Sequence, residues 1–193
     1  MEQLSKRIAA WIIKNNPESE ESYDVFVYTL ECLWGLIMAN GILLFVCSFF
    51  HMGKHAVIWS LFYNALRFYI GGSHAKTFSR CIIWGTLFSV LCVLVVPSMQ
   101  SFPFLLVIEV LFGVYVTYHI APVIHENRKV SLEHKQRLHA YGKRVVIVES
   151  LLIMGFYIGG KLWIAHSAAM GILVASILCV VGKRQFVLKR RLK

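Results

Sequence analysis

Residues 23–50 read YDVFVYTLECLWGLIMANGILLFVCSFF and carry only two charged side chains, Asp24 and Glu31. An α-helix needs about 20 mostly apolar residues to cross the roughly 30 Å hydrocarbon core of a bilayer, so this stretch is long enough to span one. Similar runs follow at residues 56–70, 81–97, 102–120, 145–160 and 164–181, of which 56–70 is the shortest. The sequence therefore predicts an all-α polytopic membrane bundle of about six transmembrane helices within residues 23–181.

The composition supports a single integral-membrane domain over residues 1–193. The chain is 58% apolar and 16% charged, with a mean hydropathy of +0.63, whereas a soluble domain carries about 25% charged residues. No loop exceeds roughly 25 residues, which leaves no room for a folded soluble domain. The net charge of +10 follows from membrane topology, so nucleic acid is not an expected partner.

Residues 1–16 predict a helix that lies in the membrane interface. One helical face carries Leu4, Ile8, Trp11 and Ile12, and the basic residues lie elsewhere. The apolar run is too short for a signal peptide, and no cleavage site follows it. If the N-terminus is cytoplasmic, seventeen of the twenty Lys and Arg residues fall on the cytoplasmic side, including those of the basic tail at residues 183–193. The positive-inside rule therefore predicts that both termini are cytoplasmic.

The cysteines and histidines do not form a recognisable metal site. Four of the five cysteines lie inside apolar runs, where Cys is an ordinary small hydrophobe: Cys32, Cys47, Cys92 and Cys179. There is no CxxC pair, and His134 and His139 are five residues apart, on different faces of a helix. We therefore expect neither a metal nor a cofactor.

Polar residues inside a bilayer are costly and usually functional. On the run at residues 56–70 they form one stripe, at spacings of four, three and four residues: Ser60, Asn64, Arg67 and Gly71. Such a stripe must face protein or water. It leads into a glycine pair, Gly71 and Gly72, which predicts the end of the helix with positive φ or a close backbone approach. His74 follows two residues later.

Cys81 opens the next apolar run and is the candidate nucleophile. In one straight helix, His74 and Cys81 would lie about 10 Å apart, too far for proton transfer, so the chain between them must bend. A cysteine at a helix N-terminus beside a histidine has its thiolate favoured by the helix dipole and the imidazolium. This is the chemistry of a Cys/His nucleophile pair. The alternative is a structural cysteine near an unrelated loop histidine.

The string Arg67-Phe-Tyr-Ile-Gly71-Gly72-Ser-His74-Ala75, followed by Cys81, resembles the signature of the accessory gene regulator B (AgrB) family. Members are integral-membrane cysteine endopeptidases of Gram-positive quorum sensing. The amphipathic N-terminal stretch and the crossing pattern are also similar, as are Ala121-Pro122 and Asn127-Arg128 before a basic loop. Lys129 departs from the family, which often has Pro there.

The resemblance implies a role for each member of the pair. Cys81 would attack a carbonyl of a short precursor peptide, with His74 as the base. A Cys or Ser of the peptide would then capture the acyl-enzyme, which gives a thiolactone or lactone ring. The reaction would take place at the cytoplasmic side of the bacterial cell membrane.

Two acidic residues are candidate supporting groups. Glu31 and Glu149 should lie within about 12 Å of the cytoplasmic end, at a depth close to Arg67. Either could pair with Arg67 or orient His74, and a purely structural salt bridge is an equal alternative. Glu109, near the middle of its span, is expected to make a helix-packing hydrogen bond.

Residues 121–144 form a predicted loop with a net charge of +4. Its basic side chains Lys135, Arg137 and Lys143 would dock the acidic C-terminal segment that such precursors carry; the alternative is topology plus attraction to anionic membrane lipids. Small residues on the last two runs would serve the bundle or a homodimer: Gly155, Gly159, Gly160, Ala168, Ala169, Gly171 and Ala175.

Two other functional classes remain alternatives. One is a small membrane transporter or peptide exporter without peptidase activity, which the intramembrane residues Arg67, Glu31, Glu109 and Asn40 suggest. Transporters commonly show internal repeats, and none is evident here. The other is a non-catalytic scaffold or receptor.

Overall fold

The structure is a computed structural model that describes residues 2–15, 23–73, 78–124 and 131–191. Within these ranges the chain folds into helices, in the order α1 (Glu2–Asn15), α2 (Tyr23–Phe49), α3 (Gly53–Ile70), α4 (Phe78–Met99), α5 (Pro103–His119), α6 (Leu132–Ile158) and α7 (Leu162–Arg191). The described residues form no strand, only an isolated bridge between Gly71 and Val123. The prediction of an all-α membrane bundle is confirmed.

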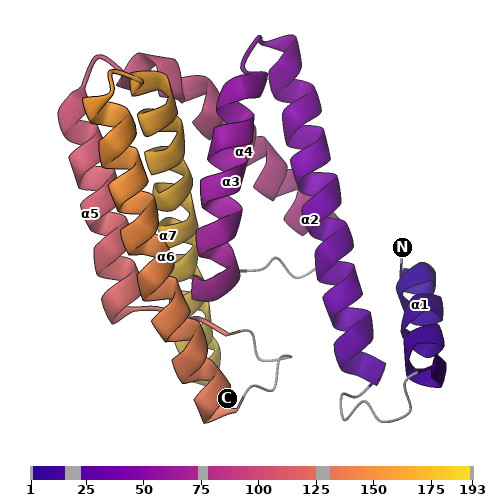
Figure 1. Ribbon diagram of the computed structural model, residues 1–193. Helices are drawn as coiled ribbons and strands as arrows, with labels where there is room; N and C mark the ends of the chain where they lie inside the picture. Colours follow the sequence, from indigo (N-terminus) through magenta and orange to yellow (C-terminus); the bar gives the residue numbers. More distant parts are fainter. Residues whose placement is uncertain (1, 16–22, 74–77, 125–130, 192–193) are drawn as a thin grey trace.

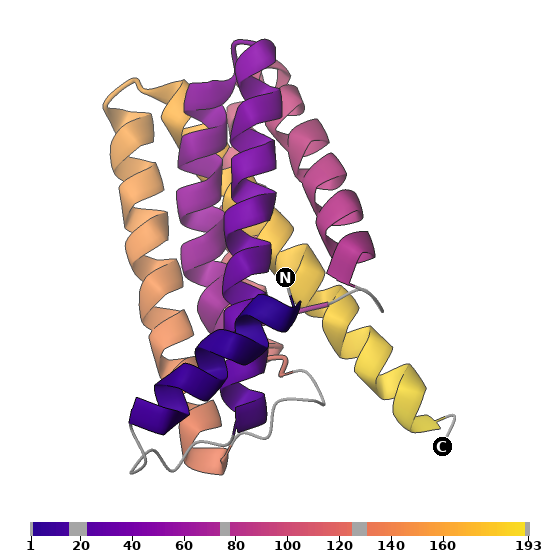
Figure 2. The same cartoon turned by 90° about the vertical axis from the view of Figure 1, so that its right-hand side faces the viewer.

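Helices α2 to α7 run alternately up and down (Figure 1). The turns α2–α3, α4–α5 and α6–α7 lie at the upper end in this view, and α3 and α5 end in the lower half, above the lower ends of α2 and α6. Helix α7 is central, since it packs against α3, α4, α5 and α6. Its C-terminal part slants away from the other helices in the lower half of the molecule (Figure 2).

The core lies on both sides of α7. One cluster of buried residues joins α3, α5, α6 and α7, and a second joins α2, α3, α4 and α7. The small residues Ala168, Ala169, Gly171 and Ala175 are buried, and a Cβ on Gly171 would meet the Trp59 carbonyl oxygen at 2.8 Å. The small residues of α7 therefore serve the bundle, because they let α3 and α5 approach closely. Gly155 on α6 has open space around it.

The outer surface of the bundle is apolar, as expected where lipid replaces water. Large side chains such as Phe45, Leu111 and Leu151 are more than 60% exposed. Within the described residues, three helical segments are long and apolar enough to cross a membrane: Val25–Phe49, Ile82–Met99 and Leu162–Gln185. Helix α5 is apolar but shorter. The chain is thus a membrane protein, while six crossings and a cytoplasmic N-terminus stay predictions.

One predicted boundary is wrong, and one helix continues past its predicted span. The predicted loop at residues 121–144 ends early, because α6 begins at Leu132 with Ser131 as its N-cap, whose hydroxyl accepts from the His134 amide at 3.2 Å. The tail from residue 183 continues α7 as far as Arg191. Both stretches are polar helical extensions. Apolar runs in the sequence reveal only the part of a helix that lies in the membrane.

Helix α1 lies beside the lower half of α2 (Figure 1). Ser5 and Ala9 are buried, and the Tyr23 hydroxyl donates to the Lys6 carbonyl at 3.3 Å. Leu4 and Trp11 remain exposed. The predicted helix is therefore present with an apolar edge left open, and its position in the membrane interface stays a prediction.

Candidate active site

The C-terminal end of α3 is the most constrained backbone of the described chain near the predicted site. Gly71 and Gly72 have φ angles of +68° and +149°, which disfavour any residue with a side chain. The Val123 amide donates to the Ile70 carbonyl at 2.9 Å. A Cβ on Gly71 would overlap the Val123 carbonyl oxygen. The predicted end of the helix, positive φ and close approach are all confirmed.

Arg67 folds back over this end of its own helix. Its guanidinium donates to the carbonyl oxygen of Gly71 through Nη1 and to that of Ser73 through Nη2, the latter at 2.8 Å. A Cβ on Gly72 would overlap the same guanidinium. A positive charge at a helix C-terminus is also favoured by the helix dipole. Arg67 therefore closes residues 71–73 into a compact segment, which we name the clamped turn.

Helix α7 holds the opposite side of the clamped turn. The Ser73 amide donates to the Leu178 carbonyl at 2.9 Å, and the Cys179 thiol donates to the Ile70 carbonyl at 3.6 Å. Gly182 lies against the peptide between Gly72 and Ser73. Three separate segments therefore fix the clamped turn: the last turn of α3, the stretch after α5 and the C-terminal half of α7.

The proposed catalytic pair is only partly within the described chain. His74 lies outside the described residues and directly follows Ser73 in the sequence. Cys81 is the fourth residue of α4, in the first turn, and its side chain is outside the described set. A first-turn position places the Cys81 backbone at the positive end of the helix dipole. The geometry between His74 and Cys81 stays a prediction.

The expected carboxylate partners of Arg67 are not found. In the described part of the chain, Arg67 binds backbone carbonyls and no acidic side chain. Both carboxyl oxygens of Glu149 are buried without a hydrogen-bond partner in the part of the chain that the structure describes, and Glu31 is half-buried. The described chain therefore shows Arg67 bound to backbone carbonyls, and a role of either acid beside His74 stays a prediction. Spacing along a helix gives a residue's depth, but it does not show that backbone carbonyls of a folded-back chain will satisfy a guanidinium.

The intramembrane polar residues other than Arg67 divide into partnered and unpartnered groups. The Asn64 amide donates to the Asn40 side-chain oxygen at 3.0 Å and so joins α3 to α2. Ser60 is buried, which confirms that the stripe faces protein. Glu109 is only 3% exposed, and neither of its oxygens has a hydrogen-bond partner among the described residues. The expected packing hydrogen bond of Glu109 is therefore wrong, whereas Asn40 has a structural role.

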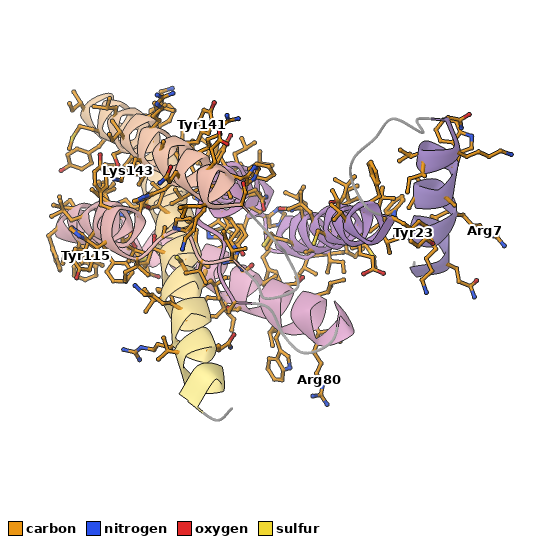
Figure 3. All side chains as sticks on the ribbon, turned by 90° about the horizontal axis from the view of Figure 1, so that it is seen from below. Arg7, Tyr23, Arg80, Tyr115, Tyr141 and Lys143 are labelled. Carbon is orange, nitrogen blue, oxygen red and sulfur yellow. The ribbon has the colours of Figure 1, made fainter. Side chains whose placement is uncertain are left out.

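The three candidate substrate-binding residues lie on α6 but not on one face. At about 100° per residue, Lys135 and Arg137 point about 160° apart. Arg137 pairs with Glu133 at 2.5 Å, and Lys143 lies over the Tyr118 ring at 4.8 Å. Figure 3, from the lower end, shows Lys143 on the α5 side of α6 and Tyr141 on another side. Arg80 points away from the bundle in the same view.

Two contributors to the site were not expected from the sequence. Leu178 contributes its backbone carbonyl, which any residue would supply. Gly182 directly follows the apolar run at residues 164–181 and belongs to no motif. A glycine near the end of the last span was the only available signal. Such a glycine is common in membrane helices, where small residues serve ordinary helix packing.

Comparisons with known proteins agree with the resemblance. The family model of accessory gene regulator B matches residues 5–180. The AgrB-like protein 2 of Clostridium perfringens (strain 13 / Type A) is 22% identical over 172 residues, which is 83% of this chain and 80% of the relative. The AgrB-like protein of Clostridium perfringens (strain SM101 / Type A) is 21% identical over 160 residues, 79% of this chain and 75% of the relative. No solved structure matches.

Proposed function

Because the chain belongs to the accessory gene regulator B family, we propose that it is a membrane-embedded cysteine endopeptidase that cleaves and cyclises a quorum-sensing precursor peptide. Family membership supports a role in quorum-sensing peptide processing. The finer proposal depends chiefly on one structural observation. The clamped turn, held from three sides, ends at the residue that precedes His74.

The proposed reaction has two acyl-transfer steps. The Cys81 sulfur attacks the carbonyl carbon of the precursor's scissile peptide bond while His74 takes the thiol proton. The C–N bond breaks, His74 returns the proton to the leaving amine, and a thioester to Cys81 remains. A Cys thiol or Ser hydroxyl of the same peptide then attacks the thioester. The ring closes as a thiolactone or lactone, and the Cys81 thiol is restored.

The position of Cys81 in α4 supports its role as nucleophile. The first turn of a helix presents unpaired amides and a partial positive charge, which favour an anionic thiolate. The four other cysteines lie farther from a helix N-terminus, at Cys32, Cys47, Cys92 and Cys179. A fixed clamped turn would give His74 a defined starting point. Such preorganisation is what a proton transfer over hydrogen-bond distance requires.

The lower end of the bundle would face the cytoplasm, where a newly made precursor is available. Helices α3 and α5 both end in this half of the bundle (Figure 1). The exposed basic residues Lys135 and Arg137 of α6 and the basic extension of α7 would attract an acidic peptide segment and anionic lipid alike. Charge reversal of Lys135, Arg137 and Lys143 should raise the KM for the precursor. An unchanged KM would assign these charges to topology alone.

Cysteine reactivity tests the pair directly. The protein in nanodiscs is treated with iodoacetamide at about pH 6, where an unperturbed thiol is almost entirely protonated, and each cysteine is followed by peptide mass spectrometry. Cys81 should react fastest, and His74→Ala should remove that advantage. Cys92 provides the internal control. Equal reactivity of Cys81 and Cys92 would contradict the proposed pair.

Reconstituted processing tests the reaction. Each candidate peptide is a synthetic precursor with an internal Cys or Ser and an acidic C-terminal segment, and mass spectrometry follows loss of that segment and ring closure. Wild type should release the acidic segment and a cyclic product, whereas Cys81→Ala should do neither. Movement of intact peptide into sealed liposomes without cleavage would instead support the exporter alternative.

A further inference from the structure

We propose that Gly182 of α7 is a positioning residue for the peptidase reaction: its missing side chain lets α7 dock on the clamped turn and so fixes the chain that leads into His74. The inference rests on the proposed function. It adds a residue 108 positions away in the sequence from the histidine that it serves.

The contact leaves no space for any side chain. A Cβ on Gly182 would lie 2.6 Å from the Gly72 carbonyl carbon, 2.6 Å from the Ser73 nitrogen and 3.0 Å from the Gly72 Cα. All three are backbone atoms, which cannot rotate away as the end of a flexible side chain can. Even alanine at this position therefore has to push α7 and the clamped turn apart.

Separation would remove the hydrogen bond that joins the two elements. The Ser73 amide donates to the Leu178 carbonyl at 2.9 Å, one helical turn from Gly182 on α7. On its other side, the Ser73 carbonyl accepts from Arg67. Ser73 is thus held at both its amide and its carbonyl, immediately before His74. Displacing α7 frees the amide but leaves the Arg67 contact available.

Gly171 provides a matched control on the same helix. A Cβ there would meet the Trp59 carbonyl oxygen at 2.8 Å and the Tyr63 nitrogen at 3.0 Å, so its backbone contact is nearly as close. It lies about 16 Å along α7 from Gly182, between α7 and the middle of α3. Gly171→Ala should therefore perturb the bundle without reaching the clamped turn. Gly155→Ala, in open space, controls for helix propensity.

The experiment combines amide exchange with peptide processing, in full-length protein in nanodiscs. Hydrogen–deuterium exchange is read at the Ser73 amide, and kcat and KM are measured with the synthetic precursor. Gly182→Ala should speed Ser73 exchange by on the order of tenfold and lower kcat by on the order of a hundredfold, with KM unchanged. Gly171→Ala and Gly155→Ala should leave Ser73 exchange at the wild-type rate.

Several results would overturn the proposal. If the Ser73 amide of the wild-type protein exchanges as fast as the amides at the chain ends, α7 does not dock on the clamped turn. Unchanged Ser73 exchange in Gly182→Ala would also exclude it, and faster exchange with unchanged kcat would exclude the positioning role. An equal fall in kcat in Gly171→Ala would indicate general destabilisation. A wild-type protein that processes no precursor refutes the proposed function instead, and the exchange measurement still decides the docking.

Discussion

Replacement of Arg67 should release the clamped turn to an extent that depends on how many of its two hydrogen bonds the new side chain can still make. The guanidinium donates to two carbonyl oxygens, those of Gly71 and Ser73. A hydrogen bond to a charged group contributes about 1.5–3 kcal/mol. Arg67 is half-buried, so in Arg67→Gln water would hydrogen-bond to the carbonyls that the guanidinium no longer reaches and offset part of the loss. We therefore expect the free energy that holds the clamped turn in place to fall by about 3 kcal/mol. That corresponds to roughly a hundredfold rise in the undocked population.

The lysine variant makes the prediction specific. Lysine carries a compact charge on a flexible stem and lacks the planar fork that reaches two oxygens at once. Arg67→Lys should therefore keep one contact and lose about 1.5 kcal/mol, roughly a tenfold change in Ser73 amide exchange. The order of exchange rates should be wild type, Arg67→Lys, Arg67→Gln, from slow to fast. Precursor processing should be fastest in wild type, slower in Arg67→Lys and slowest in Arg67→Gln.

A double-mutant cycle tests whether Arg67 and α7 act on the same segment. If both hold Ser73 in place, the effects of Arg67→Gln and Gly182→Ala on docking cannot be independent, because a turn released by one change has less left to lose from the other. The loss of docking free energy in the double variant should be well below the sum of the losses in the two single variants. Full additivity, or wild-type exchange and processing in Arg67→Lys, would refute the bidentate clamp.

Three further predictions concern other parts of the bundle. Asn64→Leu removes the hydrogen bond to Asn40 and should lower the free energy of unfolding, measured in micelles, by about 1 kcal/mol. The double variant Asn40→Leu/Asn64→Leu should lose no more than Asn40→Leu alone, because both changes remove the same hydrogen bond. Glu31→Gln and Glu149→Gln, made separately, test a third catalytic group: a fall in kcat in properly inserted protein would support it, and wild-type turnover in both would remove it. Gly71→Ala combines an unfavourable positive φ with overlap of the segment after α5, so it should raise Ser73 exchange and lower kcat more than Gly155→Ala does; equal behaviour of the two variants would contradict the tight turn.

The number and order of the helices could be predicted because the bilayer imposes a length and a composition on each span. The runs at residues 23–50 and 81–97 differ from α2 and α4 by only a few residues at each end. The glycine pair after Arg67 predicted the end of α3 for a local reason, since only glycine adopts these φ angles without strain. Where helices leave the apolar region, as at residues 132–144 and 183–191, no such constraint marks them, and the loop predicted over residues 132–144 is a helix.

The partners across the bundle depended on tertiary structure. The sequence placed Arg67 at the depth of two carboxylates, but the folded chain gave it the carbonyls of its own turn. Gly182 and Leu178 reach the clamped turn because α7 crosses the end of α3, and neither has a sequence signal of its own. Local composition and periodicity determine which segments are helical and how deep each residue lies. Which backbone atoms meet is decided by the rotation and crossing of helices, which depend on packing throughout the core.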